Sequence, residues 1–67
     1  MKISNDQITY IAYTIREALE GIMEGADPSI EIPFCVSVIE VILDAEFTED
    51  DYNTWEKLVA VIMKGVM

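Results

Sequence analysis

The chain has 67 residues, of which thirteen are acidic and four basic, so its formal net charge is −9. A negative field of this size repels nucleic acid and anionic membranes and favours partners with basic surfaces. The length allows a single domain, residues 1–67, and a chain this short buries only about 60% of the surface that it exposes when unfolded. Domains of this size usually gain further stability from disulfides, a metal or a partner subunit.

The residue types present point to a partner subunit as that source of stability. Cys35 is the single cysteine and there is no histidine, which argues against an internal disulfide and against a zinc site. The residues after Met1 are too polar for a secretory segment, and no apolar run approaches the roughly 18 residues of a membrane span. We therefore expect a cytoplasmic protein with a reduced thiol.

Residues 4–24 predict the first helix. Ser4 and Gln7 have the spacing of a capping box, and apolar residues then recur every three or four positions. Tyr10 and Tyr13 lie beside this apolar stripe, where we expect them to form its rim. Gly25 is the expected end of the helix.

Residues 33–45 predict a central helix that is apolar on almost every side. Its polar residues after the proline are Ser37, Glu40 and Asp44, whose spacing of three and four is helical. The high content of Val and Ile also suits a strand, but three consecutive apolar residues at 41–43 break the alternation that a strand requires.

A helix that is apolar on so many sides requires neighbours on three of them, and two flanking helices supply about two. We expect Val38, Ile39 and Ile42 to be fully buried.

The link before this helix allows more than one conformation. Asp27 and Pro28 could cap and begin a helix, but Pro33 would then interrupt it by removing a backbone donor. We predict a helical turn or loop over residues 28–32, with Pro33 opening the central helix. A short extended piece is the alternative.

Residues 48–64 predict the third helix. Thr48 and Asp51 repeat the capping-box spacing, and Phe47 with Tyr52 repeats the hydrophobic staple. The apolar residues that follow have the spacing of a coiled-coil seam: Tyr52, Trp55, Val59, Ile62 and Val66. The expected fold class is thus all-α, a compact bundle of three antiparallel helices with short loops.

Nothing in the sequence predicts catalysis. Cys35 lacks a histidine to activate it, and no glycine loop for phosphate is present. The acidic cluster near residues 44–51 lacks the central glycine of a calcium loop. We expect no enzyme activity, no cofactor and no metal.

The sequence is therefore interpreted as a small acidic protein–protein interaction module, a regulator or adaptor of a larger partner. The alternative is an acidic mimic of nucleic acid that inhibits a DNA- or RNA-binding protein. In size and charge alone the chain is similar in general character to small regulators of phages and mobile elements, a likeness that carries no motif.

We also expect a homodimer, formed through apolar surface that three short helices leave uncovered. The expected binding residues fall into two groups, one apolar and one acidic. The apolar candidates for partner binding are Val36, Val41, Leu43, Val61, Met67, Tyr10 and Tyr13. The acidic candidates, suited to a basic protein surface, are Glu17, Glu20, Glu24, Glu49, Asp50 and Asp51.

Overall fold

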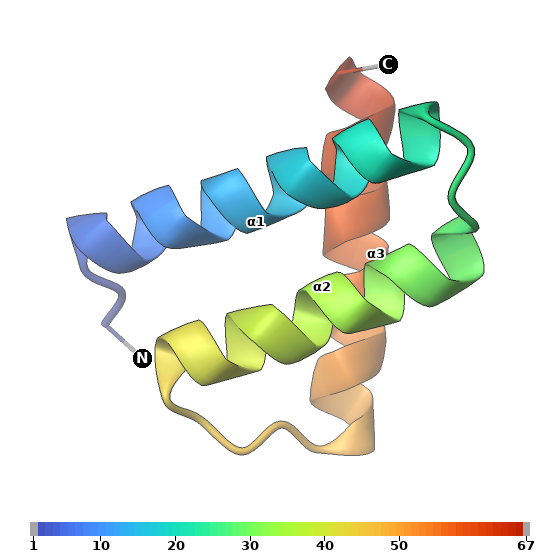
Figure 1. The fold of residues 1–67 in the computed structure, drawn as a ribbon. Helices are drawn as coiled ribbons and strands as arrows, with labels where there is room; N and C mark the ends of the chain where they lie inside the picture. Colours follow the sequence, from blue (N-terminus) through green and yellow to red (C-terminus); the bar gives the residue numbers. More distant parts are fainter. Residues whose placement is uncertain (1, 67) are drawn as a thin grey trace.

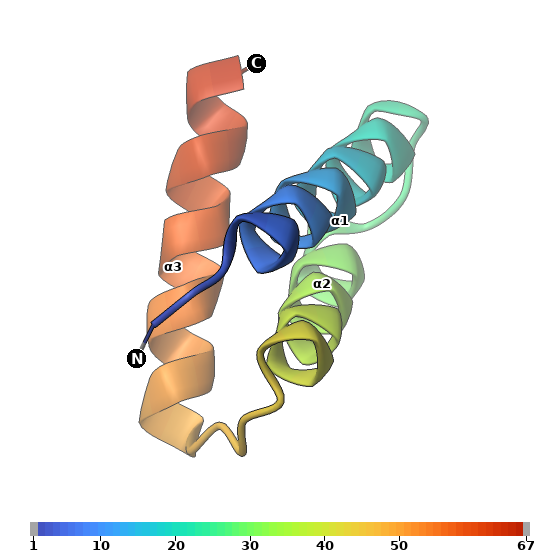
Figure 2. The same ribbon diagram turned by 90° about the vertical axis from the view of Figure 1, so that its left-hand side faces the viewer.

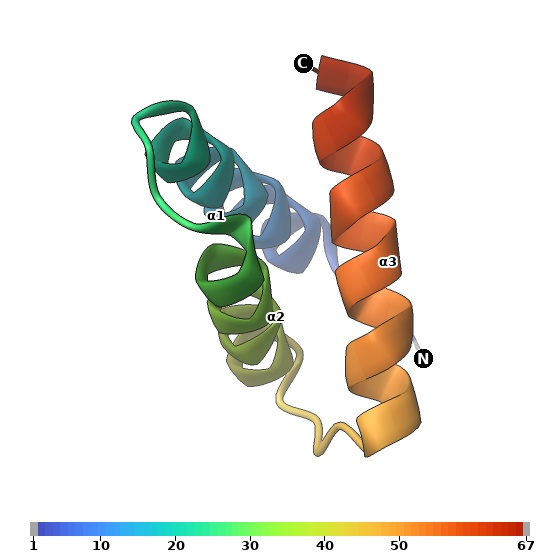
Figure 3. The same cartoon turned by 90° about the vertical axis from the view of Figure 1, so that its right-hand side faces the viewer.

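A computed structural model describes residues 2–66, which form three helices: α1 (Asn5–Met23), α2 (Pro28–Leu43) and α3 (Glu49–Val66). Helices α1 and α2 run antiparallel, side by side, and α3 crosses behind both of them (Figure 1). The side views show the same crossing (Figures 2 and 3). The predicted all-α bundle of three helices is confirmed, although only α1 and α2 have the antiparallel arrangement that was expected of all three.

Both predicted capping boxes are present. The Ser4 N–H donates to Gln7 Oε1 at 2.9 Å, and the Gln7 N–H donates to Ser4 Oγ at 3.1 Å. At the start of α3 the Thr48 N–H donates to Asp51 Oδ2 at 2.9 Å, and the Asp51 N–H donates to Thr48 Oγ1 at 3.2 Å. Each pair satisfies two N–H groups that a helix start leaves without partners.

Helix α2 begins at Pro28, five residues before the predicted start at Pro33. Of the conformations expected over residues 28–32, the helical turn is confirmed, whereas the loop and the extended piece are wrong. Asp27 caps the helix by accepting a hydrogen bond from the Ser29 N–H at 2.9 Å. Pro28 occupies the first turn, where a missing N–H costs nothing. Pro33 lies within the helix and, having no N–H, removes one backbone hydrogen bond.

Two residues with positive φ end the first two helices. Gly25 has a φ of 109° after α1, as expected of its predicted terminator, and Asp44 has a φ of 51° after α2. The Ala26 N–H donates to the Gly21 carbonyl at 3.0 Å, and the Ala45 N–H donates to the Glu40 carbonyl at 3.3 Å. These bonds satisfy carbonyl groups that would otherwise lack partners at the helix ends.

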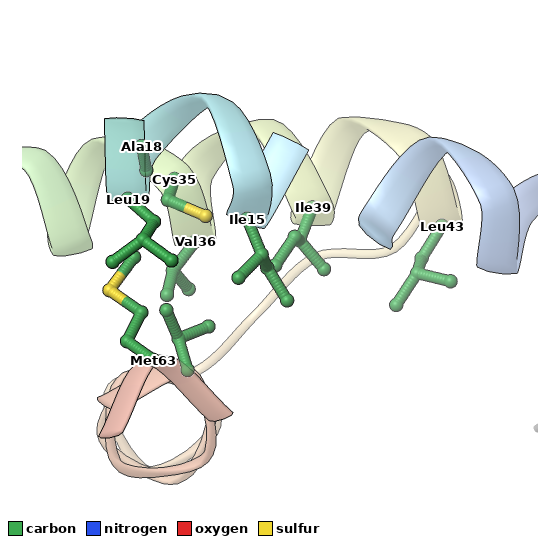
Figure 4. Packing of buried hydrophobic residues seen from close by; sticks show 9 residues of the cluster. Ile15, Ala18, Leu19, Cys35, Val36, Ile39, Leu43 and Met63 are labelled. Carbon is green, nitrogen blue, oxygen red and sulfur yellow. The ribbon is translucent and has the colours of Figure 1, made fainter. Parts of the chain in front are cut away.

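The core lies between the α1–α2 layer and the middle of α3. Val36, Ile39 and Val59 are fully buried, and Met63 reaches from α3 toward Leu19 (Figure 4). The remaining buried residues are Ile15, Ala18, Cys35 and Leu43. Because α3 meets the layer at a crossing, only Val59 and Met63 of this helix are buried.

The expected burial of the central helix is correct for one of three residues. Ile39 has no exposed surface, as predicted, whereas Val38 and Ile42 are only half-buried. These two side chains lie farther round the helix from the surface that α3 covers, because a helix turns about 100° per residue.

A carboxylate fixes the turn between α2 and α3. Glu40 Oε2 accepts a hydrogen bond from the Phe47 N–H at 2.6 Å, and Glu40 Oε1 accepts one from the Tyr52 hydroxyl at 2.7 Å. The Phe47 ring packs edge-on against Tyr52 at 5.6 Å and stacks on Trp55 at 6.0 Å between ring centroids. The predicted staple between Phe47 and Tyr52 is confirmed. The bond from the Phe47 N–H, followed by that from Tyr52, holds the pKa of Glu40 below its ordinary value of 4.5.

We predict that Ile39→Ala destabilises the protein by about 2–5 kcal/mol, the range for large-to-small changes at fully buried sites. Ile42→Ala is the matched control, because it removes the same atoms from a half-buried position. Urea unfolding of both variants measures the difference. If Ile39→Ala and Ile42→Ala lowered the unfolding free energy equally, the prediction that the buried position contributes more to stability would be contradicted.

A second prediction concerns pH. Because the folded-state pKa of Glu40 is lowered, its hydrogen bonds stabilise the protein fully above pH 4.5, and this stabilisation is lost as the pH falls through the folded-state value. The difference in unfolding free energy between wild type and Glu40→Gln should therefore shrink on acidification below 4.5. Denaturant unfolding of both proteins at a series of pH values tests this. A difference that stays constant would contradict it.

Candidate functional site

One face of the molecule carries a row of apolar side chains, of which all but Val38 are exposed. This outer face is defined by Tyr10, Tyr13, Ile30, Phe34, Val38 and Val41. Phe34 lies two residues before the buried Val36, and Val41 lies two residues after the buried Ile39. Two residues correspond to a rotation of about 200°, so Phe34 and Val41 point away from the buried side of α2. The outer face is therefore the side of the α1–α2 layer that is turned away from α3.

The row arises from helical periodicity on two adjacent helices. Ile30, Phe34, Val38 and Val41 are spaced by four, four and three residues, so they form one stripe along α2. Tyr10 and Tyr13 are three residues apart on α1, which runs antiparallel beside α2 (Figure 1). Of the six side chains, five expose between 59% and 76% of their surface.

A hollow of about 230 Å³ lies at the centre of the outer face, between α1 and α2. Tyr13 and Phe34 contribute to its lining, and the nearly inaccessible Cys35 lies at its base with 1% exposure. Two carboxylates, Glu17 and Glu31, line it as well. The outer face thus combines an apolar and aromatic centre with negative charge.

The Tyr13 hydroxyl and the Cys35 thiol both stay protonated. A hydrogen bond to Glu17, together with its negative charge, raises the pKa of the Tyr13 hydroxyl, so this group stays neutral. Burial, with a contribution from Glu31, raises the pKa of the Cys35 thiol to about 11. A thiol that stays protonated is a poor nucleophile. Within residues 2–66 no cluster of three potential metal ligands occurs.

A second apolar surface is the groove between α1 and the C-terminal half of α3, with a volume of about 460 Å³. Its exposed lining includes Ile8, Ala12, Ile62 and Val66, and its one charged lining residue is Arg16. The groove lies on a different side of α1 from the outer face, since Ala12 and Tyr10 are separated by about 200° around that helix.

The predicted apolar binding residues separate into three groups. Tyr10, Tyr13 and Val41 lie together on the outer face. Val36 and Leu43 are 0% and 8% exposed, so their prediction as binding residues is wrong. Both face the interior because α2 turns them toward the core that it shares with its neighbours.

The two remaining apolar candidates lie elsewhere. Val61 is 67% exposed, but it lies on α3 and not on the outer face. Met67 lies outside the described residues.

The predicted acidic residues are exposed but are not gathered at one place. Glu17 and Glu20 lie on α1 and Glu24 is its C-cap residue, whereas Glu49, Asp50 and Asp51 form the first turn of α3. Figure 1 shows α1 on one side of α2 and the start of α3 on the other. Glu20 Oε1 pairs with Arg16 Nε at 3.2 Å, and Asp51 accepts the capping bond described above.

Several surface residues were not predicted from the sequence. Phe34 and Ile30 are 67% and 66% exposed on the outer face, and Ile8 and Ile62 are 53% and 40% exposed in the groove. The spacing of Ile30, Phe34, Val38 and Val41 was a usable signal, but it becomes visible only when the helix is taken to begin at Pro28.

No helix within the described part of the chain combines the length and apolar character needed to cross a bilayer. Comparisons with protein-family models, with curated proteins and with solved structures find no match for this chain.

We predict that the Cys35 thiol does not react with a disulfide reagent in the folded protein at mildly alkaline pH, because it is buried and protonated. Addition of denaturant should make the single thiol react at the rate of an ordinary exposed cysteine. Absorbance of the released reagent measures both rates. Fast reaction without denaturant would contradict the burial of Cys35 beneath the outer face.

Proposed function

We propose that this protein is a non-catalytic protein–protein interaction module that binds a larger partner through the outer face. The observation that carries the proposal is the exposure of Tyr10, Tyr13, Ile30, Phe34 and Val41, each between 59% and 76%. Soluble monomers expose single apolar side chains freely but rarely expose contiguous patches of them, and such patches with polar borders mark interaction sites.

The composition of the outer face supports the same proposal. Tyrosine and other aromatic residues are enriched in protein interfaces, and tyrosine is prominent among residues whose truncation costs most binding energy. Tyr13 and Phe34 flank a hollow of about 230 Å³ into which an apolar side chain of a partner fits. Such an anchor would displace water from both rings.

The charge of the outer face indicates the chemistry of the partner. Glu17 and Glu31 line the hollow, and the whole chain carries a net charge of −9. The complementary surface has an apolar centre bordered by lysine or arginine side chains. Long-range attraction would speed the encounter, and apolar contact would provide most of the affinity.

An acidic mimic of nucleic acid is the second candidate function. The single ion pair among residues 2–66 leaves nearly all of the carboxylates available to a basic partner. Mimicry, however, calls for carboxylates aligned like consecutive phosphates, and the acidic groups of α1 and of the start of α3 lie on different sides of α2 (Figure 1). The outer face is the better supported site.

The test is site-specific photocrosslinking in the cells that produce the protein. Benzoylphenylalanine replaces Phe34 in one variant and Val61 in a matched control, because both residues are 67% exposed. We expect a discrete crosslinked partner from position 34 and none from position 61. The interaction of the purified pair should weaken at least about tenfold with Phe34→Glu and change little with Val61→Glu.

Salt separates the two candidate functions. Binding through the outer face should depend weakly on ionic strength, whereas a complex made by carboxylates alone should weaken steeply as salt is added. A partner that binds Phe34→Glu as well as wild type, and that dissociates in moderate salt, would contradict the proposal and favour the mimic.

A further inference from the structure

The groove between α1 and α3 is a second apolar surface that the proposed function does not use. Its volume is about 460 Å³, twice that of the hollow on the outer face. Ile8 is 53% exposed and Val66 is 70% exposed at its borders, while the buried Met63 lies within it. No part of residues 2–66 covers these side chains.

The α3 side of the groove is itself a ridge. Leu58, Ile62 and Val66 are spaced by four residues and are 45%, 40% and 70% exposed. Side chains at this spacing form the ridges by which helices pack into the grooves of other helices. The surface therefore has both a groove and an adjacent apolar ridge. In a twofold pair the same surface is used on both copies, so the ridge of each copy can meet the groove of the other.

The total surface of the chain is large for its mass. It exposes 4901 Å², and a compact monomer of 7.6 kDa is expected to expose about 4,300 Å². The excess of about 600 Å² over this expectation approaches the roughly 800 Å² that each partner loses in a standard interface. The chain thus exposes surplus surface of the size that one side of such an interface covers.

The distribution of charge decides which partner fits the groove. None of the thirteen acidic residues lines it, and its one charged lining residue, Arg16, is paired with Glu20 at 3.2 Å. A basic partner would gain nothing from this surface, whereas two chains with a charge of −9 can approach closely only where carboxylates are absent. A second copy of the same chain meets this condition.

We propose that the α1–α3 groove is the interface of a homodimer, in which the ridge of Leu58, Ile62 and Val66 from each copy packs into the groove of the other. Because the groove and the outer face lie on different sides of α1, the dimer leaves both outer faces open. If the function proposed above also holds, the dimer presents two partner-binding surfaces. The dimer itself does not depend on that function.

Sedimentation equilibrium of the purified chain tests the proposal across micromolar concentrations at low and high salt. We expect wild type to have twice the chain mass of 7.6 kDa, with association that strengthens or stays level as salt screens the repulsion. Ala12→Glu places a charge in the groove at an exposed helical position that a monomer tolerates. This substitution, and independently Ile8→Glu, should weaken dimerisation at least about tenfold.

Val41→Glu is the matched control, since it adds the same charge to the outer face at a residue that is 76% exposed. It should remain a dimer, and circular dichroism should show that all three variants keep the helical content of wild type. A wild type that stays monomeric at both salt concentrations would overturn the proposal. So would Ala12→Glu and Ile8→Glu variants that are folded and still dimeric. If the protein is dimeric but position 34 crosslinks no partner, the proposed function of the outer face is contradicted and the dimer is not.

Discussion

Everything in this fold depends on covering α2 with only two neighbours. Val36 and Ile39 have no exposed surface, because α1 packs beside α2 and α3 crosses beneath both (Figure 4). The same helix carries apolar residues on its remaining side, and the described residues contain no further helix that could cover them. Phe34 and Val41 therefore remain 67% and 76% exposed. The outer face is a direct consequence of an apolar helix in a chain too short to enclose it.

The position of α3 determines the second surface. Glu40 holds the Phe47 N–H at 2.6 Å and the Tyr52 hydroxyl at 2.7 Å, which fixes where α3 starts and how it leaves the turn. From that start α3 crosses the layer, so Val59 is buried at the crossing while Val66 is 70% exposed beyond it. The groove exists because the last turns of α3 extend past the point where α1 can cover them.

Features that depend on neighbouring residues are predictable from the sequence, whereas features that depend on how the helices pack are not. Capping boxes are local patterns, so the starts of α1 and α3 were predicted to within one residue. Pro33 predicts a helix boundary because an interior proline is costly, yet α2 continues through it from Pro28. Periodicity identified Val36 and Val41 as apolar but not which of them faces the core. Which residue faces the core depends on where α3 crosses α2. The position of α3 depends in turn on the hydrogen bonds of Glu40 with Phe47 and Tyr52, which lie 7 and 12 residues farther along the chain.

The two apolar surfaces differ in charge, and this difference bears on how far self-association would proceed. Glu17 and Glu31 line the hollow on the outer face, so two outer faces brought together would repel each other across an interface that excludes water. The groove lacks acidic lining residues and would permit the approach of a second copy. A twofold contact of this kind is closed, since each copy uses the same surface once. Carboxylates around the outer face would then prevent dimers from associating further, while still attracting a partner of opposite charge.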